Sequence, residues 1–216
     1  MTIEILEGLD PLIPLDFFAL KGQLPHVKEN ASSRWMQKNA LLPELSEELI
    51  QENFAQIAMG WNETCLLIDL VVDKPFEEAS YPNFREGDSF ELFIDTRDLK
   101  TTRFMTSFCH HFVFLPQAVQ GVRAQEITHF RTEDKHPLCS GDDLQVEASF
   151  HKNSYEMRLM IPSFALQGFD PSSFDRLGLS YRLNRFKGPP QLFSASAEHF
   201  LLEQQPKIWA SFLLTK

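Results

Sequence analysis

Residues 144–161, LQVEASFHKNSYEMRLMI, carry the clearest alternation of apolar and polar side chains in the chain. Every even-numbered position from 144 to 150 is apolar, and so is every odd-numbered position from 155 to 161. An alternation with period two is typical of a strand with one face in a core and the other toward solvent. The four residues between the runs, 151–154, are few enough for a hairpin turn, so the stretch predicts an antiparallel pair of strands.

Short apolar runs on both sides of this hairpin extend the prediction to the rest of the chain. We expect a short helix at 44–52, after Pro43, and one helical turn at 162–167. Further strands are expected at 54–61, 64–73, 89–95, 103–115 (ended by Pro116), 119–131, 177–186 and 208–214. Many short strands with little helix between them predict a mostly-β protein, an antiparallel, jelly-roll-like β-sandwich.

Domain organisation follows from the absence of repeats, low-complexity segments and Gly/Ser linkers. The 216 residues suffice for one large β domain that buries a full core. We therefore predict a single domain over 1–216, with an irregular N-terminal arm and its short helix at 1–52 and the sandwich core at 53–216.

Composition excludes several classes of partner and indicates a compartment. A formal net charge of −10 repels phosphate backbones and anionic lipids, so we expect neither nucleic acid nor membrane as a partner. Three widely spaced cysteines do not form a disulfide framework, and the first residues have no basic and apolar leader pattern. These features predict a reducing, cytoplasmic location.

The stretch DSFELFID, residues 88–95, places two carboxylates on one face of a strand. Glu91 and Asp95 share this face, whereas Phe90 and Ile94 point the other way. A carboxylate held on a strand can accept hydrogen bonds from ligand hydroxyls. A solvated face, or pairing of Glu91 with an arginine, explains the same pattern without a ligand.

Polar side chains on two other predicted strands are candidates for the same site. Arg182 and Asn184 share a face and offer a fork of donors and an amide to a polar ligand, although Arg182 could equally neutralise Glu91. His110 shares parity with core phenylalanines, and His111 shares parity with polar residues and is placed to reach Glu91 and Arg182. A lone histidine of this kind is more often structural than functional.

No motif for catalysis or metal binding stands out. The chain has no phosphate-binding glycine loop, nucleophile elbow or paired cysteines for zinc, so we predict a non-catalytic protein. His110 and His111 are neighbours on one strand and cannot chelate one ion together. Asp134, His136 and Cys139 lie scattered in one predicted loop, and we predict no metal there. Phe84, in a predicted loop, could present an aromatic face to a ligand or pack beneath the loop.

The order of these elements resembles the family 9 carbohydrate-binding modules and the wider DOMON-like sandwiches. The resemblance covers residues 54–214 and rests on GDSFELFID (87–95), GLSYRLN (178–184) and PKIWASFLL (206–214). It implies an antiparallel sandwich whose sugar site pairs two stacking aromatics with a glutamate. The glutamate falls on Glu91, the aromatics near Phe84 and Phe200, and a polar position on Arg182. The resemblance also implies calcium as a candidate cofactor, but the family's calcium sites cannot be placed on residues of this chain, so the residues themselves predict no cofactor.

Two functional hypotheses follow. In the first, the chain is a non-catalytic domain that binds a carbohydrate or another polar small molecule on a polar sheet face. Its ligand-binding residues are Glu91, His111, Arg182 and Asn184, with Phe84 and Phe200 as walls. In the second, it is a structural or protein-interaction domain, whose partner is another protein and which has no small-molecule ligand.

Overall fold

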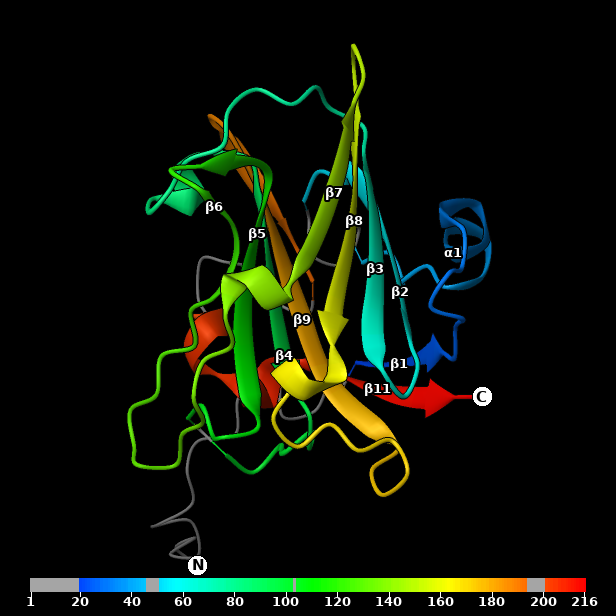
Figure 1. The fold of residues 1–216 in the computed structure, drawn as a ribbon, viewed down its shortest axis with the longest axis vertical. Helices are drawn as coiled ribbons and strands as arrows, with labels where there is room; N and C mark the ends of the chain where they lie inside the picture. The colour runs from blue at the N-terminus through cyan, green and yellow to red at the C-terminus, as the bar shows by residue number, and fades with distance from the viewer. Residues whose placement is uncertain (1–19, 46–50, 103, 194–200) are drawn as a thin grey trace, which may run out of the picture.

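The computed structural model describes residues 20–45, 51–102, 104–193 and 201–216, and these form two β-sheets packed face to face (Figure 1). The larger sheet contains, from edge to edge, β1 (Lys21–Pro25), β11 (Ala210–Thr215), β9 (Arg176–Arg185), β4 (Ser89–Asp95), β5 (Cys109–Val119) and β6 (Val122–Glu126), with β10 (Gly188–Leu192) also paired to β9. The smaller sheet contains β2 (Ala55–Trp61), β3 (Cys65–Val72), β8 (Tyr155–Pro162) and β7 (Gln145–Phe150). The predicted antiparallel β-sandwich is therefore confirmed.

The hairpin predicted from residues 144–161 is β7 paired with β8, from Gln145 opposite Met160 to Phe150 opposite Tyr155. Tyr155 and Leu159 are completely buried in the core between the sheets, where side chains of β4, β5 and β9 meet them. β7 is an edge strand, so its apolar side chains are only partly covered, and Phe150 remains about half exposed. The period-two pattern thus fixes which face of each strand enters the core.

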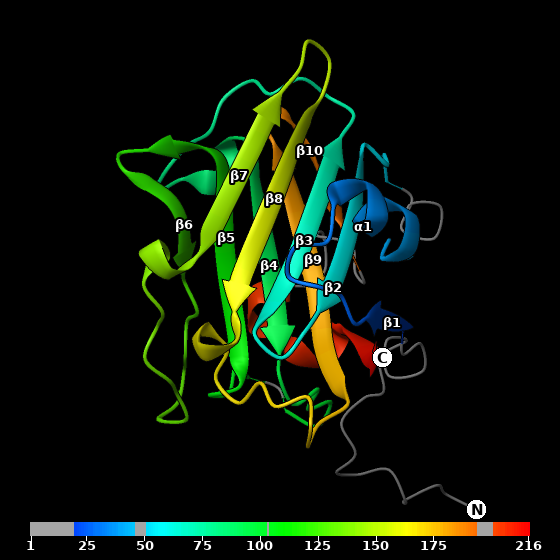
Figure 2. The same ribbon diagram turned by 45° about the vertical axis from the view of Figure 1, so that its right-hand side comes forward.

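The N-terminal arm is more regular than predicted. β1 pairs in parallel with β11, and α1 (Ser33–Asn39) begins at Ser32, whose hydroxyl accepts a hydrogen bond from the backbone N–H of Trp35. α1 packs its one buried residue, Met36, on the outer face of the smaller sheet (Figure 2). Most of the predicted helix at 44–52 lies outside the described residues.

Two strand ends differ from the prediction. β5 begins at Cys109, not at 103, and it continues through Pro116 to Val119. The pairing of β5 with β6 shifts register between Phe114 and Val119, and a proline without an N–H is tolerated at such an irregularity. The predicted strand at 119–131 is correspondingly short and ends at Glu126 as β6.

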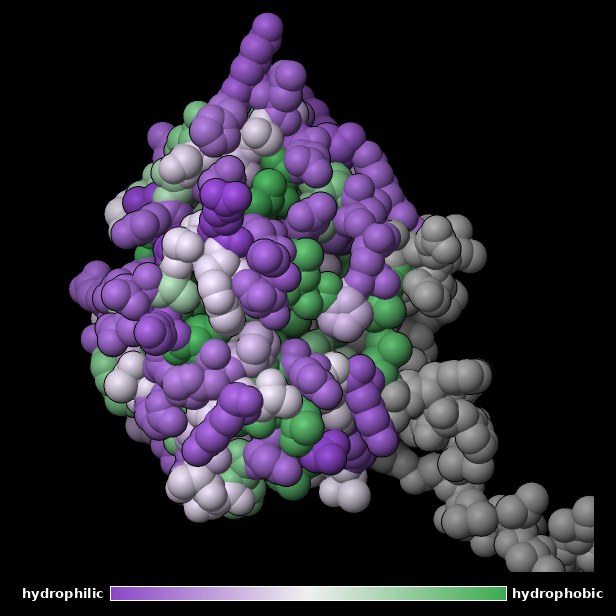
Figure 3. All heavy atoms as spheres, turned by 90° about the vertical axis from the view of Figure 1, so that its right-hand side faces the viewer, coloured by the Kyte–Doolittle hydropathy of each residue, from purple (hydrophilic) through white to green (hydrophobic). Residues whose placement is uncertain are grey.

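The outer faces of the two sheets differ in what covers them. Within the described residues, five short 3-10 turns join the strands: η2 (Phe84–Glu86), η3 (Gly141–Asp143), η4 (Ser163–Ala165), η5 (Leu202–Gln204) and η6 (Pro206–Ile208). η5 and η6 lie against the outer face of the larger sheet, where Leu202 and Trp209 bury Phe93 of β4. The side of the molecule that carries α1 is mostly hydrophilic, with apolar residues in small separate areas (Figure 3). No helix among the described residues is long and apolar enough to cross a membrane.

Candidate functional site

Glu91 lies at the centre of the larger sheet, because β4 is flanked by β9 and β5. The apolar residues Phe90 and Leu92 face the core, so the intervening Glu91 must point to the opposite, outer face. The register places Glu91 directly opposite Arg182 of β9, and places His111 of β5 opposite Phe93. The side chain of Glu91 is completely buried on this face.

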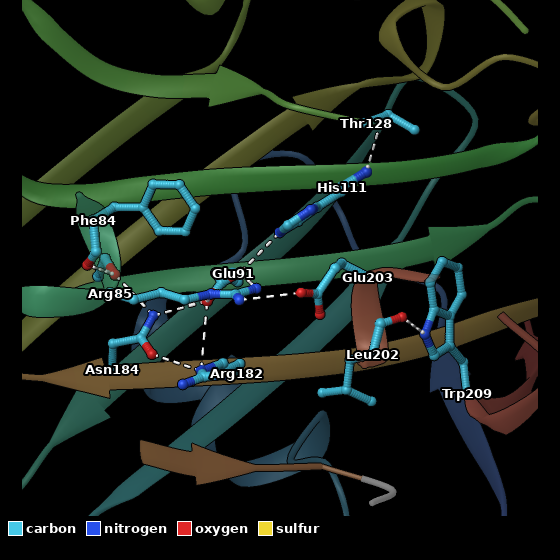
Figure 4. Close-up of polar contacts among 11 residues, drawn as sticks. Phe84, Arg85, Glu91, His111, Thr128, Arg182, Asn184, Leu202, Glu203 and Trp209 are labelled. Atoms are coloured by element: carbon cyan, nitrogen blue, oxygen red, sulfur yellow. Dashed lines mark hydrogen bonds and ion pairs between the residues drawn. The ribbon is translucent and has the colours of Figure 1, made fainter. Parts of the chain in front are cut away.

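The carboxylate of Glu91 accepts hydrogen bonds from three side chains (Figure 4). Arg85 binds it bidentately, with Nε 2.8 Å from Oε1 and Nη2 2.7 Å from Oε2. His111 Nε2 lies 2.9 Å from Oε2, and Asn184 Nδ2 donates to Oε1 at 2.9 Å. Arg182 adds an ion-pair contact at 3.6 Å and donates to Asn184 Oδ1 at 2.7 Å. Both carboxylate oxygens are therefore fully engaged by protein donors.

These partners determine the protonation state of Glu91. Burial alone would raise the pKa of the carboxyl, but the hydrogen bonds and charges of His111 and Arg85 outweigh it and lower the pKa to about 2. Glu91 is consequently an anion at neutral pH, and a group with so low a pKa is a poor general base. Its chemistry at this position is to hold cationic donors in place.

Arg85 connects this buried carboxylate to the surface. It comes from η2, in the segment that leads into β4, and its Nη1 donates to Glu203 of η5 at 3.1 Å. Burial tends to lower the pKa of Arg85, but Glu91 and Glu203 together raise it above its ordinary value. The side chain of Arg85 is about one third exposed, and its guanidinium is held by Glu91 and by Glu203.

A surface hollow of about 420 Å³ lies beside this network. It is lined by Pro82, Asn83, Phe84, Arg85, Glu86, His111, Ile127, His129 and Glu203. Phe84 is one of these lining residues, and its ring centroid lies 5.8 Å from the guanidinium carbon of Arg85. Figure 4 shows the two side chains next to each other. Ser89 anchors the turn by donating from its hydroxyl to the carbonyl of Phe84 at 2.6 Å. The hollow thus combines an aromatic wall with polar groups on ordered elements.

The structure places four of the predicted site residues in one cluster. Glu91, His111, Arg182 and Asn184 are in direct contact, as their strand parity predicts. The pairing of Glu91 with arginine, the alternative explanation of the sequence, also occurs. Of these four, only His111 lines the hollow, which Phe84 also lines. Phe200 lies outside the described residues.

Sequence reasoning missed Arg85 and Glu203. Arg85 reaches Glu91 because the loop before β4 turns back over the strand, where Asp88 accepts hydrogen bonds from the backbone of Glu77, Glu78 and Phe186. The only sequence signal for Arg85 is a cation six residues before a strand glutamate. Glu203 is 118 residues away from Arg85, and nothing in the local pattern links the two.

Comparison with known proteins supports the fold alone. No protein-family model matches the chain, and no curated protein matches it in sequence. Among solved structures, a family 9 carbohydrate-binding module from Caldicellulosiruptor kristjanssonii in complex with cellotriose superposes with a TM-score of 0.64 and 12% identity, over 90% of this chain and 93% of that one. The same kind of module from that organism in complex with glucose gives a TM-score of 0.61 at 12% identity, over 91% and 95% of the two chains.

A third similar structure is described as a putative carbohydrate-binding protein from Bacteroides uniformis, with a TM-score of 0.59 and 11% identity over 91% of this chain and all of that one. Each of the three comparisons covers at least 90% of this chain. The chain therefore has the β-sandwich fold of the family 9 carbohydrate-binding modules.

Proposed function

We propose that the chain is a non-catalytic binding domain that takes a carbohydrate or a similar polar small molecule in the hollow beside Arg85. The observation that carries this proposal is the state of Arg85. Its guanidinium is fixed by Glu91 and Glu203, its side chain is about one third exposed, and it lines a hollow together with Phe84. Donors that are held in place before binding lose little conformational freedom when a ligand arrives.

The chemistry of the hollow matches a hydroxyl-rich ligand. Arg85 presents donors, Glu203 presents an acceptor, and Phe84 offers an apolar face, which together suit the mixed polar and apolar surface of a sugar ring. A volume of about 420 Å³ is within the range of small-molecule sites. The fold comparison supports the same class of ligand, because two of the similar structures hold cellotriose or glucose.

In this proposal the buried residues position the exposed ones. Glu91 has no free oxygen for a ligand, and Asn184 is buried with its amide bound to Glu91 and to Ser89. Their role is to fix Arg85 and Arg182, whose side chains are partly exposed. This changes the expected contribution of Glu91 from direct ligand contact to support of the contact residues.

The test is isothermal titration calorimetry of the full chain with glucose, cellotriose and, as a non-sugar polar anion, citrate. Phe84→Ala removes the aromatic wall without touching the buried network. It should weaken binding by about 1 kcal/mol, or roughly fivefold in Kd. The matched control is Phe164→Ala, which removes an exposed phenylalanine that does not line the hollow.

A ligand whose affinity falls in Phe84→Ala but not in Phe164→Ala supports the proposal and identifies the ligand class. Equal effects of the two variants place the ligand elsewhere on the molecule. No binding of any probe by the wild-type chain contradicts the proposal and favours the alternative of a structural or protein-interaction domain.

A further inference from the structure

A second polar cluster lies on the other face of β5. His110 points away from His111, toward the space between the sheets, where it meets Glu126 at the end of β6 and His136 from the following loop. One nitrogen of each histidine and one oxygen of Glu126 lie within 4.8 Å of one another. The three side chains are 0, 4 and 0% exposed for His110, His136 and Glu126. None of the three residues lines the hollow beside Arg85.

The hydrogen bonds of His136 define which nitrogen faces the cluster. Its Nδ1 lies 2.7 Å from the backbone carbonyl of Ser107, and a carbonyl can only accept, so Nδ1 carries a proton. Nε2 lies 2.8 Å from Oε1 of Glu126. A neutral imidazole with its proton on Nδ1 has a lone pair on Nε2, and this lone pair is directed at the carboxylate, so a proton or a metal ion must lie between the two groups.

His110 and the crowding around one oxygen favour the metal ion. Nδ1 of His110 and the hydroxyl of Thr128 also lie 2.8 Å from Oε1 of Glu126, so three groups converge on a single oxygen. Nε2 of His110 is buried without a hydrogen bond to any described residue. A metal ion on Nδ1 would leave Nε2 as the protonated nitrogen of the ring.

The residues around the cluster have the arrangement expected of an outer shell. Metal-bound histidines commonly donate their other N–H to a backbone carbonyl, and metal-bound carboxylates are themselves hydrogen-bonded. His136 meets the first condition through Ser107, and Glu126 meets the second through the backbone N–H of Cys139, which lies 2.8 Å from Oε2. The three candidate ligands are thus oriented by neighbours that do not themselves occupy the centre.

We propose that His110, Glu126 and His136 form a structural binding site for one divalent transition-metal ion of the zinc class. Two imidazoles and one carboxylate are a donor set that suits zinc, and the site is too buried for a substrate. Nδ1 of His110 lies 2.8 Å from Oε1 of Glu126, and no two of the three ligand atoms are more than 4.8 Å apart. These values bracket the distance between two ligand atoms in a tetrahedral zinc site. That spacing is about 3.3 Å for bonds of about 2.0–2.1 Å.

The experiment uses the full chain, stripped with a chelator and dialysed, and two readouts of metal binding. Titration with Co²⁺ should give visible absorption bands of tetrahedral intensity that saturate at about one equivalent and disappear when Zn²⁺ is added. A thermal-shift series should show stabilisation by Zn²⁺ and Co²⁺ but not by Ca²⁺ or Mg²⁺, which prefer oxygen ligands. The spectrum is measured on the wild-type chain, so it does not depend on a variant that folds.

His136→Ala and Glu126→Gln should each weaken Zn²⁺ binding by at least about 100-fold, measured by competition with a chromogenic chelator. His151→Ala is the matched control, because His151 is an exposed histidine that lies in neither the cluster nor the hollow, and the Zn²⁺ affinity of this variant should equal that of the wild type. The proposal is overturned if the wild-type chain shows no tetrahedral Co²⁺ spectrum. It is also overturned if only His151→Ala loses the metal, since binding would then be at the surface. Sugar binding at the Arg85 hollow is a separate measurement that neither result changes.

Discussion

Replacement of Glu91 by glutamine tests the central network directly. Glu91→Gln keeps the size of the side chain but removes its charge and turns one acceptor oxygen into a donor. Glu91 is completely buried and accepts from Arg85, His111 and Asn184, so the amide nitrogen would face a donor on whichever side it lies. Removal of one partner from a buried ion pair costs about 3–5 kcal/mol.

For Glu91→Gln we expect a somewhat smaller loss in the free energy of unfolding, about 2–4 kcal/mol, for two reasons. The glutamine oxygen can still accept from one neighbour, and Arg85 keeps its contact with Glu203 and its partial exposure to water. The measurement is urea unfolding followed by the fluorescence of Trp61 and Trp209, both of which are buried. With a slope of about 3 kcal/mol/M for a chain of this size, the midpoint should fall by roughly 1 M.

Glu203→Gln is the control, because it removes the partly exposed partner of the same arginine. Its cost should stay below about 1 kcal/mol, as for other surface ion pairs. The reasoning is refuted if Glu91→Gln unfolds within about 0.5 kcal/mol of the wild type, or if the two variants cost the same. Either result would mean that the buried ion pairs of Glu91 contribute no more to the free energy of unfolding than a partly exposed pair does.

Three further predictions concern acid, packing and thiols. The pKa of Glu91 is depressed to about 2, against about 4.3 in an unfolded chain, so its contribution is complete above the unfolded value and is lost as pH falls between them. Acid-unfolding curves of Glu91→Gln should be flatter over that window than those of the wild type. Gly87→Ala should lower the free energy of unfolding by about 1–3 kcal/mol, measured in urea, because its Cβ would lie 2.7 Å from the carbonyl oxygen of Glu78. Burial first, and then nearby carboxylates, raise the pKa of Cys109 and of Cys139 to about 12. A thiol reagent at pH 8 should therefore react slowly with the native chain and rapidly in denaturant, and rapid native labelling would contradict this.

The sequence predicted the sandwich and the buried side of the site because both depend on strand parity. Alternation in residues 144–161 predicts a hairpin with one buried face, and parity alone places Glu91, Arg182 and His111 on one face. Neighbouring strands then bring these residues into contact, since β4 is flanked by β5 and β9. Strand parity also predicted that His110 lies on the face of β5 that packs between the two sheets, where it is completely buried.

The residues that sequence reasoning missed are positioned by loops and by long-range packing. Arg85 comes from a 3-10 turn, and Glu203 comes from another 3-10 turn that is 118 residues further along the sequence. His136 comes from a loop that folds back onto β5. None of these contacts follows from a repeating pattern. α1 was missed for a related reason: Met36 is its one buried residue, so the segment lacks an apolar stripe at helical spacing.

The pairing of β1 with β11 has a consequence for the order in which the protein folds. Leu24 and Thr215, which this pairing brings into hydrogen-bond contact, are separated by 191 positions. Closing so long a loop costs chain entropy before the contact stabilises anything, and topologies rich in such contacts fold slowly. During synthesis β1 leaves the ribosome long before β11, so β1 cannot join the larger sheet until β11 has been made. Until then residues 21–25 remain an unpaired strand, available to other chains, and this is the interval in which a chaperone would matter most.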